Sequence, residues 1–191
     1  GRLPADEAAA WGLALQAFTI AGAVALVPLQ VWLHRLADAM HRNDHGRQRR
    51  EIGLALGFAV LAMTTGTLAL QFIGPPLLQL IGSEVGLPPF ATLALMGLAF
   101  LIEALIMVLV NPLLLAKDLG FVPIYLGVAA VALAGATAAL ASGLPPAVAM
   151  LLLPLLLQGL VTLPWLARRT SRTLGRRKDL ANPTEAAGAG R

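Results

Sequence analysis

Residues 47–73, "RQRREIGLALGFAVLAMTTGTLALQFI", pass abruptly from a cluster of charges to 22 residues that carry no charge. About 20 helical residues cross the hydrocarbon core of a bilayer, which is roughly 30 Å thick. Backbone N–H and C=O groups in lipid must be hydrogen-bonded within the segment, which favours an α-helix. The stretch therefore predicts a membrane-spanning helix that starts beside a basic cluster.

The remainder of the chain repeats this apolar pattern. Of its 191 residues, 58% are hydrophobic and 13% are charged, and the mean hydropathy is +0.77. Soluble domains carry about 25% charged residues, so this composition excludes an ordinary soluble domain. It predicts an all-α fold, a polytopic membrane bundle. We expect five membrane-spanning helices, at about residues 11–33, 52–73, 90–110, 121–140 and 146–166.

The segments that flank the predicted spans suggest where the bundle ends. We expect the bundle to occupy residues 8–167, and a tail at 168–191 to be basic at first and then disordered. The pairs "NP" at 111–112 and "SG" at 142–143 are expected to end the third and fourth spans, and Pro28 to kink the first. The connection at 74–90, with a proline pair near each end, fits either a short helix at the membrane surface or a plain loop. The chain begins with Gly1 and has no basic leader, so we expect a fragment of a longer protein.

Basic residues alternate between the two sides of the predicted membrane. The connection after the first span has five arginines, the one after the third has Lys117, and the segment after the fifth has six basic residues. The connections after the second and fourth spans have none. Because basic loops are retained in the cytoplasm, the C-terminus is predicted to be cytoplasmic.

Few polar side chains lie within the predicted spans. Glu103 is the only ionisable residue deep in a span, and such a residue normally faces a bundle interior or an aqueous cavity. It is either a contact for an ion, proton or substrate, or a carboxyl group hydrogen-bonded to a neighbouring helix. Thr65, within "TTGT", and Gln71 suit hydrogen bonds in a wet cavity, although helix packing is the alternative for these threonines.

The histidines lie together in the first connection. His34, Asp38 and His41 have helical spacing on one face, which is compatible with a metal site. His45 belongs to the turn-like sequence "RNDHG", so the helix is expected to end before it. The nearby arginines also disfavour a divalent cation, so we predict a cytoplasmic connection whose arginines contact lipid phosphates, with no metal.

Motifs of catalysis are absent from the sequence. It contains no phosphate-binding Gly-Lys-Ser/Thr loop, no HExxH and no supported serine–histidine–aspartate arrangement. Zero cysteines exclude disulfides and thiolate chemistry. We therefore expect neither an enzyme nor a bound cofactor.

Several short motifs follow one another in an order typical of a transporter family. They are "WGLALQ" at the start of the first span, Pro28 near its end, then "HRLADA", "RND" and "RQRRE". With "FIGPPLLQLIGSE" and "NPLLLAKDLGFVPIYLGVAA" further on, they resemble the polysaccharide flippases of the multidrug/oligosaccharidyl-lipid/polysaccharide exporter superfamily. The resemblance covers roughly residues 5–167. It implies a larger bundle of two lobes around a central cavity, in which these five spans form most of the C-terminal lobe.

The resemblance also implies a function and its partners. Such a protein flips lipid-linked oligosaccharide or polysaccharide precursors, as used for lipopolysaccharide, across the bacterial inner membrane by alternating access. Its partners would be membrane lipids, the lipid-linked glycan, H⁺ or Na⁺ as coupling ion and the missing N-terminal lobe, but no nucleic acid. The glycan diphosphate needs a cationic cavity, and Arg35, at the inner end of the first span, is our first choice for that contact. Glu103, Gln71 and Thr65 are further candidates for the cavity.

Three other functional classes remain open. A drug or metabolite exporter of the same superfamily would rely on acidic cavity residues. A membrane-embedded glycosyltransferase or acyltransferase would need a polar cluster at a membrane face, for which residues 34–45 are the only candidate. A non-transport subunit of an export apparatus is the third.

Overall fold

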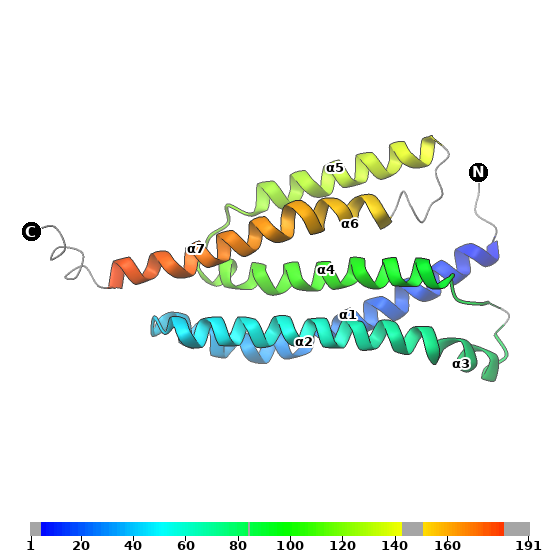
Figure 1. Cartoon of the computed structure of the whole chain (residues 1–191), viewed down its shortest axis with the longest axis horizontal. Helices are drawn as coiled ribbons and strands as arrows, with labels where there is room; N and C mark the ends of the chain where they lie inside the picture. Colours follow the sequence, from blue (N-terminus) through cyan, green and yellow to red (C-terminus); the bar gives the residue numbers. More distant parts are fainter. Residues whose placement is uncertain (1–4, 84, 143–150, 182–191) are drawn as a thin grey trace, which may run out of the picture.

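The computed structural model describes residues 5–83, 85–142 and 151–181, and within these ranges the chain forms helices and turns but no strand. The helices run roughly along one long axis, with α4 between the α1–α2 pair and the layer formed by α5, α6 and α7 (Figure 1). Their bounds are α1 Ala5–His41, α2 His45–Phe72, α3 Gly74–Leu80, α4 Phe90–Leu115, α5 Val122–Ala141, α6 Leu153–Leu157, the π-helical turn η2 Gln158–Thr162 and α7 Leu163–Ala181.

Four of these helices, α1, α2, α4 and α5, are long and apolar enough to cross a membrane. The prediction of an all-helical membrane bundle is therefore confirmed, whereas the predicted number of spans was five. The fifth predicted span begins at residues 146–150, outside the described residues, and continues as α6, η2 and α7. The π-helical turn divides it, because the N–H of Leu163 bonds to the carbonyl of Gln158, five residues back.

Helix ends differ from the predicted spans because hydropathy marks only the apolar part of a helix. α1 continues to His41, and α2 already begins at His45, so both extend into the charged connection. α4 passes through the "NP" pair, which was expected to end it, and stops at Leu115. There the Asn111 amide donates to the Met107 carbonyl at 2.7 Å, and Pro112 is fully buried inside the last turns.

The connection at 74–90 and the tail after residue 167 differ in structure from a plain loop and a disordered end. The connection at 74–90 does contain a short helix, α3, rather than a plain loop. The basic part of the predicted tail is helical, since α7 runs to Ala181 and so includes the first residues of the stretch expected to be disordered. The rest of that stretch, 182–191, lies outside the described residues.

Three helices end in the same left-handed turn, with positive φ at Asn43 (54°), Gly82 (68°) and Lys117 (58°). At each turn two N–H groups bond back to carbonyls of the preceding helix, as in the Schellman motif. Glycine adopts this conformation freely and asparagine tolerates it, whereas a lysine is strained there. Lys117 therefore carries a conformational cost that the other two turns largely avoid.

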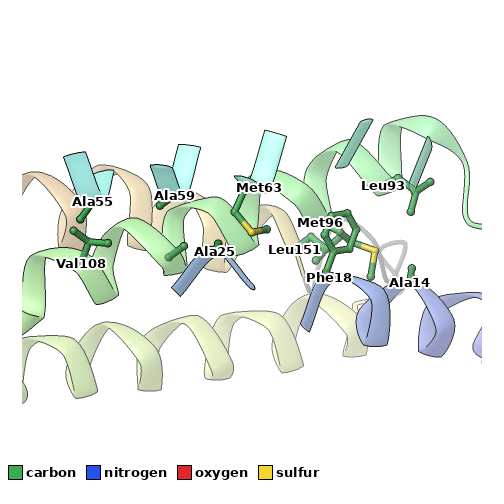
Figure 2. Packing of buried hydrophobic residues seen from close by; sticks show 11 residues of the cluster. Ala14, Phe18, Ala25, Ala55, Ala59, Met63, Leu93, Met96, Val108 and Leu151 are labelled. Atoms are coloured by element: carbon green, nitrogen blue, oxygen red, sulfur yellow. The ribbon is translucent and has the colours of Figure 1, made fainter. Parts of the chain in front are cut away.

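The core lies where α1, α2 and α4 meet. Ala55, Ala59 and Met63 follow one another at four-residue spacing along α2, and all are buried in the cluster that includes Val108 of α4 (Figure 2). Small side chains let helix backbones approach closely, which compensates for the weak hydrophobic drive between helices in lipid. A second cluster, which includes Ile106, Leu113 and Leu166, joins α4 to the α6–α7 segment.

Candidate functional site

A hollow lined mainly by polar and charged side chains lies at the turn between α1 and α2. It has a volume of about 620 Å³ and is open to the surroundings. Arg47 of α2 contributes to it, and the other lining residues belong to α1: His34, Arg35, Ala37, Asp38 and His41. We refer to it below as the basic hollow.

Buried hydrogen bonds fix the two helices around this hollow. The amide of Gln48, only 1% exposed, donates to the Ala39 carbonyl of α1 at 3.0 Å. The carboxylate of Asp44 accepts from the N–H of Arg47 at 3.0 Å and so caps the start of α2. Because these bonds tie the first turn of α2 to the end of α1, Arg47 is held opposite the α1 side chains.

Charge in the basic hollow is not balanced. Its one carboxylate, on Asp38, faces Arg42 at 3.6 Å. Neither Arg35 nor Arg47 has a side-chain hydrogen bond or ion pair within the described residues. Two free guanidinium groups from different helices can bind an anion with two acidic groups, because each guanidinium forms a planar fork for oxygen atoms.

The three histidines lie on either side of the turn between α1 and α2, and α1 ends before His45, as predicted. His34, Asp38 and His41 all line the hollow, as their helical spacing indicated. His45 lies beyond the turn, starts α2 and contacts Gln48 at 3.3 Å through Nδ1. Among residues 5–83, 85–142 and 151–181, no group of three or more histidine, aspartate or glutamate side chains is arranged to hold a metal ion.

Glu103 lies on α4 and is half-buried. Its carboxylate accepts a hydrogen bond from the Tyr125 hydroxyl of α5 at 2.9 Å. This is the contact with a neighbouring helix that we gave as the structural alternative for Glu103. The residue does not line the basic hollow, so the structure does not place it beside Arg35.

Gln71 lies in a second, mostly apolar pocket of about 250 Å³ between α2 and α4. Its side-chain oxygen is buried and has no hydrogen-bond partner among the described residues. Thr67 lines the same pocket, but its hydroxyl donates to the Met63 carbonyl of its own helix at 2.8 Å, and its side chain packs against Gly97. Thr67 therefore has the packing role that we gave as the alternative for these threonines. Thr65 is exposed and does not line this pocket, so it contributes neither to packing nor to a cavity.

The four candidate residues therefore do not form one site. Arg35 lies near the C-terminal end of α1, beside the turn to α2, whereas Gln71 lies near the C-terminal end of α2. The 24 residues from Arg47 to Gln71 correspond to roughly 36 Å of helix. Of the four, only Arg35 lies in the basic hollow.

Sequence reasoning missed a polar network that joins α7 to the turn between α4 and α5. Arg169 donates to both carboxylate oxygens of Asp118 and to the Gly120 carbonyl, and its guanidinium lies 5.2 Å from the centre of the Trp165 ring. The Thr173 hydroxyl donates to Asp118 as well. The hydrogen bonds from Arg169 hold the pKa of Asp118 below its ordinary value of 3.8. The only sign in the sequence was an acidic residue in an otherwise basic connection.

Two buried polar residues of α2 were also missed. Gln48 and Glu51 lie in a stretch that the sequence presents as a charged connection, yet both are buried because α2 starts at His45. Glu51 is 8% exposed, and one of its carboxylate oxygens has no hydrogen-bond partner within the described part of the chain.

Comparisons with known proteins do not assign the chain to a family. No protein-family model matches it, and neither a curated protein nor a solved structure is significantly similar to it. The resemblance to polysaccharide flippases thus stays a prediction that rests on the motifs quoted above.

Proposed function

We propose that the chain is the C-terminal portion of a flippase that moves lipid-linked oligosaccharide or polysaccharide precursors across the bacterial inner membrane by alternating access. The proposal combines the motif resemblance with the chemistry of the basic hollow. A lipid-linked glycan has a long apolar chain, a diphosphate and a polar sugar. A transporter for it needs an apolar path for the chain and a cationic site for the diphosphate.

One observation on α1 carries the proposal. Val24, Val27 and Val31 are 56%, 60% and 58% exposed, and Arg35 follows Val31 by one helical turn on the same side of the helix. An exposed apolar row therefore leads directly to an unpaired guanidinium. A lipid chain lying along the valines would bring its diphosphate to Arg35, with Arg47 across the hollow as the second guanidinium.

The architecture and orientation belong to the same proposal. The apolar part of α6, η2 and the start of α7 supplies a fifth span, and the partner lobe covers apolar faces that the five spans leave exposed. The turn between α1 and α2 and the end of α7 face the cytoplasm, since arginines concentrate there. Single cysteines test this orientation cleanly, because the chain has none of its own. A cysteine that replaces exposed Arg49 should react with a membrane-impermeant thiol reagent only in opened cells. A cysteine that replaces exposed Gln79 of α3 should react with it in intact cells whose outer membrane is permeable.

The test of function uses the full-length protein in cells whose glycan export depends on it. Replacing Arg35 and Arg47 together by alanine should lower export at least tenfold, because both guanidinium groups of the hollow are lost. Arg49 and Arg50 are exposed and do not line the hollow, so their double alanine variant removes the same charge as a control. Normal export by the Arg35/Arg47 variant would refute the diphosphate assignment. Absence of any glycan export by the wild-type protein would refute the flippase itself.

A drug exporter of the same superfamily finds less support. It would depend on Glu103, whose carboxylate is hydrogen-bonded to Tyr125 and lies outside the basic hollow. Measuring drug efflux beside glycan export separates the two. Drug efflux that Glu103→Gln abolishes, by a wild-type protein that exports no glycan, would favour the drug exporter.

A further inference from the structure

The basic residues of α7 differ in how they are engaged. The side chain of Arg169 donates hydrogen bonds to Asp118 and Gly120, and its guanidinium lies over the Trp165 ring. Arg168 and Arg172 are exposed, and neither guanidinium has a partner in the part of the chain that the structure describes. These two arginines are available to a ligand.

The rotation of α7 about its axis is fixed by contacts with α4. Thr170 is 3% exposed and its hydroxyl donates to the Leu109 carbonyl at 3.1 Å, while Leu166 is completely buried. Arg168 and Arg172, four residues apart, therefore share the side of α7 that faces away from the bundle.

The same segment presents exposed apolar side chains on the turns before these arginines. Leu160 is 73% exposed and Val161 46% exposed. The eight residues from Leu160 to Arg168 correspond to roughly 12 Å of helix. An apolar surface on η2 thus leads to a pair of unpaired guanidinium groups on α7.

We propose that Leu160, Val161, Arg168 and Arg172 bind an anionic phospholipid of the surrounding membrane. An acyl chain covers the two apolar residues, and the headgroup phosphate lies between the two guanidinium groups. The apolar part of the surface selects a lipid over a free phosphate. Because Arg168 and Arg172 pair with no carboxylate among the described residues, their positive charge selects an anionic over a zwitterionic headgroup. This inference does not rest on the proposed transport function.

The experiment is lipid titration of the purified full chain in detergent, monitored by native mass spectrometry. The probes are phosphatidylglycerol and phosphatidylcholine with identical acyl chains. The double substitution Arg168→Gln and Arg172→Gln should weaken phosphatidylglycerol binding by about 25-fold, which is about fivefold for each arginine, and leave phosphatidylcholine binding unchanged. Each single substitution should weaken phosphatidylglycerol binding about fivefold. The single variants replace the double variant in the test if the double variant fails to fold. The substitution of exposed Arg49 and Arg50 by glutamine is the matched charge control and should change neither affinity.

Three outcomes would overturn the proposal. Equal binding of the two lipids by the wild-type chain would remove the headgroup selectivity. An equal loss of phosphatidylglycerol binding in the Arg49/Arg50 control would show attraction to overall charge rather than to this surface. Displacement of the lipid by an excess of inorganic phosphate would identify a free-anion site.

Discussion

Arg169 binds Asp118 through two parallel hydrogen bonds, Nε to Oδ2 at 2.9 Å and Nη2 to Oδ1 at 2.5 Å, across 51 positions of sequence. The pair joins α7 to the turn between α4 and α5, and both side chains are about 30% exposed or less. A Cβ on Gly120 would displace the Arg169 guanidinium, so the glycine leaves room for this pair. These contacts give α7 a charged link to the bundle, in addition to the hydrogen bond from Thr170 to the Leu109 carbonyl.

Replacing Arg169 by glutamine should lower the stability of the purified protein. The change removes a bidentate, charge-assisted pair and leaves the Asp118 carboxylate without its main donor, at a cost of about 1–2 kcal/mol. For a chain of this length, that corresponds to a Tm lower by roughly 2–8 °C in a thermal melt. Arg168→Gln removes the same charge from the neighbouring position and should leave the Tm in detergent unchanged. An equal loss of Tm in both variants would show that the pair is not responsible.

Acid should weaken the same pair. The pKa of Asp118 is lowered in the folded protein, chiefly by the Arg169 hydrogen bonds. A group with a depressed folded pKa contributes stability above its unfolded pKa, and that contribution is lost as the pH falls through the folded value. The Tm advantage of the wild type over Asp118→Asn should therefore be full at pH 7 and shrink below about pH 4. An advantage that stays constant down to pH 2 would contradict this link.

The strained turn after α4 offers a stabilising substitution. Lys117 has a φ of 58°, a conformation that costs a residue with a Cβ about 1 kcal/mol relative to glycine. Lys117→Gly should therefore raise the stability by about 0.5–1 kcal/mol, measured as an increase in Tm or in resistance to a denaturing detergent. Asn43→Gly, at the equivalent position of the turn after α1, should gain less because asparagine tolerates this conformation. A larger gain at Asn43 would argue against backbone strain as the cause.

The π-helical turn contains a buried hydroxyl that lacks a partner. Thr162 is 1% exposed, and its Oγ1 has no hydrogen bond with any described residue. Thr162→Val keeps the shape of the side chain and removes the unpaired polar atom. The free energy of unfolding should therefore stay equal or rise by up to about 1 kcal/mol, and the Tm with it. Thr170→Val is the contrasting variant, since it removes the bond to Leu109 and should lower the Tm. If Thr162→Val is as destabilising as Thr170→Val, the hydroxyl of Thr162 has a partner after all.

Much of the fold follows from local sequence. The absence of charge over residues 52–73 predicts a spanning helix, and the "RND" turn correctly separates α1 from α2. Helix ends were less predictable, because α2 begins at His45 in a stretch whose charges suggested a solvated connection. The charges of a membrane helix that continues beyond the lipid look the same in sequence as those of a loop.

The candidate site was predictable only in part. Arg35 could be chosen because it follows an apolar span, but its partner Arg47 could not, since their proximity depends on how tightly the turn folds α2 against α1. Gln71 and Glu103 were chosen as isolated polar residues in apolar spans. Isolation in the sequence does not indicate which neighbour a side chain meets, and the structure places Gln71 in the pocket beside α4 and Glu103 against Tyr125.

The sequence by itself determined that the chain is an all-helical membrane bundle, because hydropathy and the need to pair backbone groups in lipid act along each segment separately. It also determined the position of the α1–α2 turn. Tertiary structure alone decided which arginines are free and which are engaged. Arg168 and Arg169 are neighbours with identical side chains, yet a rotation of 100° about the axis of α7 points one away from the bundle and the other onto Asp118.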